Sequence, residues 1–176
     1  MSLPTGSTIG IIGGGQLGRM LAMAAARLGY RTLVLEPQPD CPAAQVANRQ
    51  IVAAYDDATA LAELAAASAV VTYEFENVPV AAARRLSDAV AVYPPARALE
   101  VAQDRVTEKQ FLNGIGIATA DFRPVDSDAE LAAALKAFDG SGILKTRRLG
   151  YDGKGQRVFR NMEAGGYAGT CEAMGN

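Results

Sequence analysis

The chain opens with a short β-rich run, a glycine turn and a helical segment, and this order constrains the fold more than any other feature. Thr8–Ile12 predicts a strand, Gly13–Gly18 holds four glycines, and Arg19–Leu28 is rich in Ala, Met and Leu, as expected of a helix. Gly29 is placed to end that helix. Strand, glycine turn and helix are the opening of a parallel α/β unit, because glycine lets the backbone turn tightly between the two elements.

The same alternation continues to about residue 95. Further strands are predicted at 31–35, 49–53, 69–73 and 89–93, with helices at 57–67, capped by Asp56 or Asp57, and at 79–86. Pro94 and Pro95 end this part. We therefore expect residues 1–95 to form one Rossmann-like, doubly wound parallel sheet.

A second unit is predicted after one or two polar helices that span residues 96–113 and end at a break at 114–118. It contains a strand at 121–125, a helix at 128–138, strands at 142–145 and 156–159, and a weak helix from Met162. A glycine-rich segment joins the last two strands. Two strands that flank such a segment fit a lid over the phosphates of a nucleotide.

The segment Leu144–Gln156 carries the strongest chemical signal. Its three glycines stand among four cations and one acid, which are Lys145, Arg147, Arg148, Lys154 and Asp152. Glycine lets several backbone N–H groups point at one anion, and lysine adds a mobile charge. Lys145 follows an apolar pair on a strand that we expect to be buried, where a bound anion would compensate the ammonium. A hairpin turn with solvated charges is the alternative.

Polar residues also follow the predicted fourth strand of the first sheet. Glu74, Glu76 and Asn77 come directly after it, and the carboxyl ends of parallel strands form the ligand crevice of such a sheet. These residues should lie beside the Gly13–Gly18 turn, where Gln16 adds polar reach. Capping of the next helix by Glu76 or Asn77 is the competing interpretation.

The glycine turn also matches a dinucleotide-binding pattern. Gly13, Gly15 and Gly18 fit GxGxxG, and Glu36 ends the second predicted strand as the expected acid. An NAD-dependent oxidoreductase is therefore an alternative. Equally, the N–H groups of the turn could hold any phosphate at the start of the helix.

Composition excludes several function classes. The 176 residues contain no histidine, which removes Ser-His-Asp and Cys-His catalysis and histidine-ligated metals. A net charge of −2 gives no global basic field for nucleic acid. Cys41 and Cys171 lie far apart and suggest two reduced thiols, and no apolar run is long enough to span a membrane. We expect a cytoplasmic protein that binds neither nucleic acid nor membrane.

Four motifs together resemble a known family. They are Ile11–Met20 (IIGGGQLGRM), Tyr73–Pro79 (YEFENVP), Gln103–Arg105 (QDR) and Leu144–Gln156 (LKTRRLGYDGKGQ). In this order and spacing they resemble N(5)-carboxyaminoimidazole ribonucleotide synthase, the ATP-grasp enzyme of microbial purine biosynthesis. This family is also described as the ATPase subunit of phosphoribosylaminoimidazole carboxylase.

The resemblance implies a fold and a reaction. The fold would be α/β, with a Rossmann-like pre-ATP-grasp domain at 1–95, a helical connector at 96–118, and the first part of an α+β ATP-grasp domain at 119–176. Its C-terminal half would be missing. In the reaction, ATP phosphorylates bicarbonate to carboxyphosphate, and the amine of 5-aminoimidazole ribonucleotide then takes the carboxyl group. The family uses Mg²⁺ and is usually homodimeric.

The resemblance also implies site residues. Positions that would bind ATP are Arg105, Lys145, Gly150, Tyr151, Asp152, Gly153, Lys154, Gly155 and Gln156. Those that would face the ribonucleotide are Gln16, Leu17, Glu74, Tyr151, Asp152 and Lys154, with Asp152 and Lys154 as the catalytic pair. Ligands for Mg²⁺ are expected beyond residue 176, so we expect the 176-residue chain not to turn over ATP alone. A non-catalytic nucleotide-binding module and a related ATP-grasp carboxylase or formyltransferase are competing interpretations of the same motifs.

Overall fold

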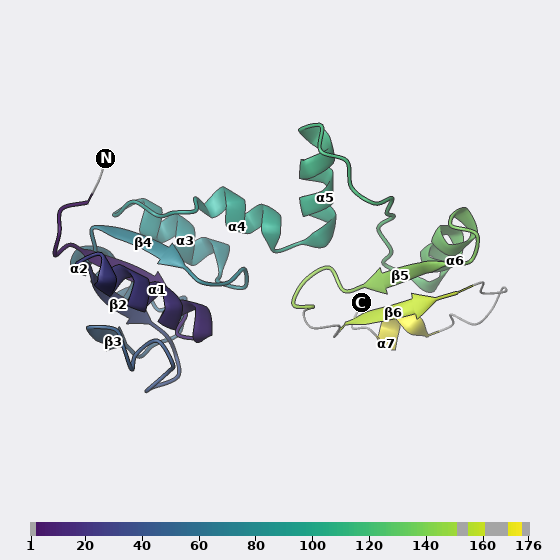
Figure 1. Cartoon of the computed structure of the whole chain (residues 1–176). Helices are drawn as coiled ribbons and strands as arrows, with labels where there is room; N and C mark the ends of the chain where they lie inside the picture. The colour runs from purple at the N-terminus through teal and green to yellow at the C-terminus, as the bar shows by residue number, and fades with distance from the viewer. Residues whose placement is uncertain (1–2, 151–154, 161–168, 174–176) are drawn as a thin grey trace. The chain divides into compact units, whose positions relative to one another are not determined.

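A computed structural model describes residues 3–150, 155–160 and 169–173 of the chain. The chain divides into two compact units, residues 1–100 and 101–176, each with its own secondary structure (Figure 1). The three-part division at residues 95 and 118 stays a prediction.

Unit 1 is built on a parallel four-stranded sheet, which confirms the predicted fold class. Its strands are β1 (Thr8–Ile12), β2 (Arg31–Leu35), β3 (Arg49–Ile51) and β4 (Val70–Tyr73), in the order β3-β2-β1-β4. Strand β4 lies at the edge of the sheet beside β1, and Ile12 of β1 lies opposite Tyr73 of β4. The glycine turn after β1 and the polar segment after β4 therefore leave the sheet side by side.

Helices cover both faces of this sheet. Successive side chains of a strand point to opposite faces, so the apolar residues of these strands need a helix packed on each face. The helices are α1 (Gln16–Arg27), α2 (Ala58–Ala67) and α3 (Val80–Ser87), followed by α4 (Ala96–Ala102). Ile11 and Val34 pack with Ala22 of α1 on one face. Ile12 and Leu35 pack on the other face with apolar residues of α2 and α3.

Several boundaries in unit 1 differ from the sequence predictions. The first helix begins at Gln16, three residues before the predicted start at Arg19. Of the two predicted candidates, Asp56 and Asp57, it is Asp57 that caps α2: its side chain accepts a hydrogen bond from the N–H of Ala60 at 2.8 Å. The predicted fifth strand at 89–93 is wrong: only an isolated parallel bridge joins Val92 to Val71 of β4. The third strand is shorter than predicted.

Unit 2 contains a helix that precedes a small α+β arrangement. Its elements are α5 (Arg105–Gly114), α6 (Asp128–Ala137), β5 (Gly142–Lys145), β6 (Gln156–Phe159) and α7 (Thr170–Ala173). The two strands pair antiparallel, with Lys145 opposite Gln156. Leu131 and Leu135 of α6 form the core of this part with Phe159 and Cys171, and Leu144 packs against it.

Two sequence predictions for unit 2 need correction or fall outside the described residues. Residues 121–125 form no strand, so that prediction is wrong; of these five residues only Val125 is buried. The weak helix predicted from Met162 begins among residues that lie outside the described ranges. No helix in the described part of the chain is long and apolar enough to cross a bilayer.

Asp128 connects the start of α6 to α7. The cap of α6 is Ser127, whose hydroxyl accepts a hydrogen bond from the N–H of Glu130 at 3.3 Å. Next to it, the carboxylate of Asp128 accepts hydrogen bonds from the N–H groups of Gly169 and Cys171, the latter at 3.1 Å. These bonds, that from Cys171 first, lower the pKa of Asp128.

Candidate functional site

In unit 1 the glycine turn is already occupied by a carboxylate of the protein. Glu74, the first residue after β4, accepts the N–H of Gly15 through Oε1 at 2.7 Å and the N–H of Gly18 through Oε2. A negative group is favoured there because the first N–H groups of a helix have no partner within it. The prediction that these groups are free to bind a phosphate is therefore wrong for Gly15 and Gly18.

Two glycines make this close approach possible. Gly13 has a φ of 103°, and a Cβ there would lie 2.4 Å from Cγ of Glu74. At Gly18 a Cβ would lie 2.6 Å from the carbonyl oxygen of Gly13. Both positions need glycine because the turn packs against itself and against Glu74.

Glu36 supports the turn from its other side. Its Oε2 accepts hydrogen bonds from the N–H of Gly14 at 2.8 Å and from the hydroxyl of Tyr55 at 2.5 Å. Burial, and then the hydrogen bond to Glu36, raise the pKa of Tyr55. The acid that a dinucleotide site would offer to a ribose is thus hydrogen-bonded within the fold, which counts against the oxidoreductase alternative.

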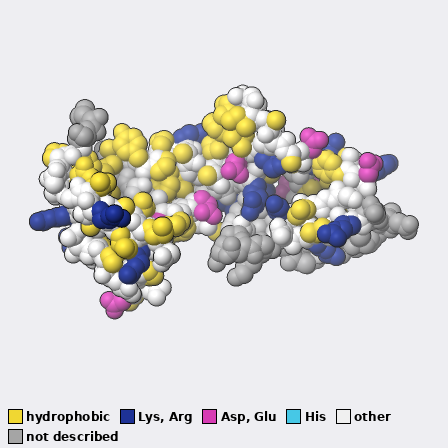
Figure 2. Space-filling model, viewed as in Figure 1, with side chains coloured by type: hydrophobic (Ala, Val, Ile, Leu, Met, Phe, Trp, Pro, Cys, Tyr) yellow, Lys and Arg dark blue, Asp and Glu magenta, His cyan; other side chains and the backbone are white. Residues whose placement is uncertain are grey.

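A small cavity of about 190 Å³ opens at this turn. Its lining includes Glu36, Tyr55, Glu74 and Phe75. Gln16 and Leu17 do not line it; both are exposed at the start of α1, Leu17 to 57%. Figure 2 shows apolar and basic side chains lying together over α1.

The segment after β4 does not cap the next helix through a side chain. The cap of α3 is Pro79, and no side chain makes a capping hydrogen bond to this helix. Asn77 donates to the carboxylate of Glu76 at 3.4 Å. Capping by Glu76 or Asn77 is therefore wrong, and a ligand role for these residues stays a prediction.

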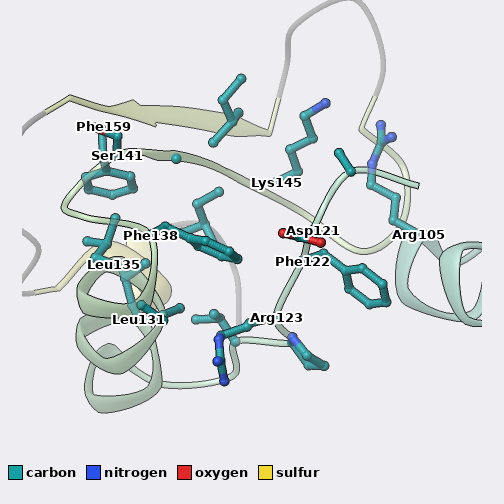
Figure 3. Close-up of a pocket in the computed structure, with 18 of the residues that line it drawn as sticks. Arg105, Asp121, Phe122, Arg123, Leu131, Leu135, Phe138, Ser141, Lys145 and Phe159 are labelled. Carbon is teal, nitrogen blue, oxygen red and sulfur yellow. The ribbon is translucent and has the colours of Figure 1, made fainter. Parts of the chain in front are cut away.

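A larger cavity, of about 650 Å³, lies within unit 2. Figure 3 shows the rings of Phe122 and Phe138 along it, with the charged ends of Arg105 and Lys145 on the same side of the view. Lys109 also lines it and lies 5.1 Å from the ring centre of Phe122. Arg123 and Arg147 line it too, so five cations share the cavity with the aromatic rings. This is the chemistry of a nucleotide site: a base can stack on the rings and phosphates can bind the cations.

The predicted burial of Lys145 is wrong. Lys145 is exposed, and Ile143 on the same strand is 56% exposed. Among the residues that the structure describes, strand β5 pairs with β6 alone, and of the apolar pair Leu144 but not Ile143 packs on the core. Since the ammonium is solvated, it needs no bound anion to be stable. The case for Lys145 now rests on its place in the cavity lining beside Arg105.

Arg105 is held by the segment that follows β5. Its backbone N–H donates to the carbonyl of Arg147 at 3.0 Å, and its Nη2 donates to the carbonyl of Gly150 at 2.7 Å. A guanidinium has five N–H groups, and the bond to Gly150 is the one side-chain hydrogen bond of Arg105 among the described residues, so further donors are available to a ligand there.

The other predicted ATP-binding positions are only partly described. Gly155, with a φ of 65°, accepts the N–H of Thr146 at 2.8 Å, and Gln156 begins β6. The predicted residues Tyr151, Asp152, Gly153 and Lys154 lie outside the described residues.

Sequence reasoning missed several residues of both regions. Tyr55, Phe122 and Phe138 stand in no motif, and no local pattern marks them as cavity-lining. Asp104 does carry a local signal, since an aspartate directly before a helical segment predicts an N-cap. It caps α5, accepting the N–H groups of Val106 and Thr107 at 3.0 Å each.

Comparison with known protein families gives two matches along the chain. Residues 6–103 match the ribonucleotide synthetase preATP-grasp domain, and residues 110–173 match the ATP-grasp domain.

Individual relatives agree with these matches. An N5-carboxyaminoimidazole ribonucleotide synthase of Brucella melitensis is 73% identical over 162 residues, which are 92% of this chain and 45% of that protein. The crystal structure of the Staphylococcus aureus synthetase with ADP matches with a TM-score of 0.87 and 42% identity, over 90% of this chain and 43% of that one. An Aspergillus clavatus synthase in complex with ADP and 5-aminoimidazole ribonucleotide matches with a TM-score of 0.77 and 28% identity, over 89% and 42% of the two chains. The chain thus spans less than half the length of these relatives.

Proposed function

This chain belongs to the ribonucleotide synthetase preATP-grasp family, and on that basis we propose that it forms part of an ATP-dependent N5-carboxyaminoimidazole ribonucleotide synthase. The observation that carries the proposal is the cavity of unit 2, where aromatic side chains and the cations Arg105 and Lys145 share one lining. Such a lining suits a nucleoside triphosphate better than a neutral ligand, because catalysis of phosphoryl transfer depends on positioning and charge neutralisation.

The proposed reaction has two steps. An oxygen of bicarbonate takes the γ-phosphoryl group of ATP, which gives carboxyphosphate and ADP. The exocyclic amine of 5-aminoimidazole ribonucleotide then attacks the carboxyl carbon, the C–O bond to phosphate breaks, and inorganic phosphate and a proton leave. Arg105 and Lys145 would bind phosphate oxygens of ATP, and Asp152 and Lys154 would act on the reacting groups. Mg²⁺ would neutralise phosphate charge; no cluster of three acidic or cysteine ligands exists among the described residues.

Glu74 would serve the ribonucleotide in unit 1. Each of its oxygens takes one N–H of the turn, and a carboxylate oxygen has a second lone pair to offer. A carboxylate accepts from hydroxyl groups and repels phosphate, so we propose that Glu74 binds the ribose hydroxyls and that the 5′-phosphate points away from it. Gln16 and Leu17 would flank the same ligand.

The proposal is tested in the complete enzyme that carries this sequence. We expect release of ADP that requires both bicarbonate and 5-aminoimidazole ribonucleotide, and a fall in kcat/KM for ATP of at least about tenfold in Lys145→Ala. Lys136→Ala is the matched control, because Lys136 is an exposed lysine of the same unit outside the cavity lining. Equal activity in the two variants would contradict the role of Lys145.

A second test separates this proposal from the oxidoreductase alternative. ATP should raise the melting temperature of the 176-residue chain and NADH should not, whereas stabilisation by NADH alone would overturn the assignment. The chain alone should not hydrolyse ATP in response to 5-aminoimidazole ribonucleotide.

We propose further that the complete enzyme is a cytoplasmic homodimer. The dimer follows from the family resemblance, and the cytoplasmic location is supported by two unpaired thiols, Cys41 and Cys171. Light scattering on the purified enzyme measures the first, and fractionation of the source cells the second.

A further inference from the structure

Three consecutive residues at the start of α5, Gln103, Asp104 and Arg105, hold the segment that follows β5. Gln103 accepts a hydrogen bond from Nη2 of Arg148, and Arg105 bonds to the carbonyls of Arg147 and Gly150. Between them, Asp104 accepts from Nε of Arg147 at 2.9 Å, and the same Oδ2 lies 2.9 Å from Nη2 of that guanidinium. The partners are about 43 residues apart in sequence, so these contacts fix one part of unit 2 to another.

The carboxylate of Asp104 joins two parts of this arrangement, because its two oxygens bind different partners. Oδ1 caps α5, and Oδ2 holds the guanidinium of Arg147. The side chain of Asp104 is 18% exposed and that of Arg147 44% exposed. One acidic group therefore ties the start of the helix that carries Arg105 to the segment whose carbonyls orient Arg105.

The electrostatics of Asp104 agree with an ionised group in this position. Burial, the largest single influence, opposes ionisation, but hydrogen bonds from the N–H of Thr107, the side chain of Arg147 and the N–H of Val106 outweigh it. Together with the positive charge of Arg147 they lower the pKa of Asp104.

We infer that Asp104 is a positioning residue for ATP binding: through Arg147 it holds the backbone to which Arg105 is hydrogen-bonded, and so aims the guanidinium of Arg105 at the triphosphate. This inference rests on the proposed function. Asp104 does not touch the phosphates, so its effect passes through Arg105. An interaction that prepares the site before ATP arrives strengthens ground state and transition state alike, and its loss raises KM without changing kcat.

Asp104→Asn separates this role from capping. Asparagine is as good an N-cap as aspartate, so α5 keeps its cap, while the negative partner of Arg147 is lost. We expect the Kd and KM for ATP to rise about three- to fivefold, the change that a partly exposed charge pair supports. The kcat, the KM for 5-aminoimidazole ribonucleotide and the melting temperature should stay close to the wild-type values.

Arg147→Ala should raise the Kd for ATP at least as much, because Arg147 also lines the cavity. Adding Asp104→Asn to Arg147→Ala should cause no further increase, because the interaction between the two residues is already lost. Glu100→Gln is the matched control: Glu100 also binds two arginines, Arg84 and Arg97, and all three residues belong to unit 1. Each variant is measured in the complete enzyme, by calorimetric titration of ATP without the second substrate and by steady-state kinetics.

The two measurements separate the inference from the proposed function. If the wild-type enzyme binds ATP but shows no carboxylation, the proposed function fails, and a weaker Kd in Asp104→Asn still supports the positioning role. If the wild type is active and Asp104→Asn binds ATP as tightly as Glu100→Gln does, the inference is overturned. Additive effects of Asp104→Asn and Arg147→Ala would overturn it as well.

Discussion

If the carboxylate of Glu74 accepts hydrogen bonds from N–H groups of the glycine turn, removal of this side chain should create a binding site for a small carboxylate. In Glu74→Ala the N–H groups of Gly15 and Gly18 lose their acceptor. A hydrogen bond to a charged group contributes about 1.5 kcal/mol at its lower limit, which is appropriate here because the residue is only half-buried. Two such bonds give a loss of about 3 kcal/mol.

Formate is the matching rescue reagent, because it restores the carboxylate without the side chain. At ten times its Kd a ligand stabilises the folded state by about 1.4 kcal/mol, so formate should recover about half of the loss. The assay is chemical unfolding of the 176-residue chain in sodium formate or in sodium chloride of equal ionic strength. The chloride series removes general salt effects from the comparison.

Glu76→Ala is the control for this experiment. Glu76 is an exposed carboxylate two residues along the same segment and accepts no hydrogen bond from the turn among the contacts of the described residues. Formate should stabilise Glu74→Ala and leave Glu76→Ala and the wild type unchanged relative to chloride. An equal response of all three proteins to formate would refute the claim that Glu74 occupies the N–H groups of the turn. Glu74→Gln keeps one acceptor oxygen and should show a smaller loss and a smaller rescue.

Two further predictions concern stability. Gly13→Ala should destabilise unit 1 by about 1 to 3 kcal/mol, because the added Cβ meets Glu74 and the backbone at this position is left-handed. Gly6 has a similar φ of 87° but open space around it, so Gly6→Ala should lower the free energy of unfolding by less. The midpoints of urea unfolding of the two variants measure this difference. The folded-state pKa of Asp128 is lowered, by the N–H of Cys171 first, so its contribution to stability is present above the ordinary aspartate pKa and is lost as pH falls through the lowered value. Asp128→Asn should therefore flatten the acid side of the stability profile, and an unchanged profile in acid titrations followed by circular dichroism would contradict this.

The sequence predicted the elements of unit 1 well because their signals are local. The β-rich run before Gly13 and the helix after it are predicted from residues close together in the chain. The cap of α2 was narrowed in the same way to Asp56 or Asp57, and the structure shows Asp57 in this role. The fifth strand failed because a strand needs a partner along its length, and Val92 finds Val71 over only one bridge. The β-propensity of residues 89–93 does not show how many of them find a partner in the sheet.

The candidate site was predicted less completely, because its contacts are long-range. The sequence placed Glu74 near the turn by the rule for carboxyl ends of strands, but its capture by Gly15 and Gly18 depends on the register that sets Ile12 opposite Tyr73. The burial of Lys145 could not be judged from two apolar neighbours, since exposure depends on what covers β5.

The two units differ in the groups that they offer to an anion, and this difference supports the ligand assignment that we propose. In unit 1 the N–H groups of Gly15 and Gly18 already donate to a carboxylate, that of Glu74, so a phosphate that approached them would be repelled by its negative charge. In unit 2 the guanidinium of Arg105 has more N–H donors than its bond to Gly150 uses, and Lys145 is exposed and lines the same cavity. On the proposed assignment, acceptors would face the ligand in unit 1 and donors would face it in unit 2. A hydroxyl-rich sugar suits the first and a triphosphate the second, so exchanging the two ligands would place like charges together in unit 1 and leave the cations of unit 2 without a partner.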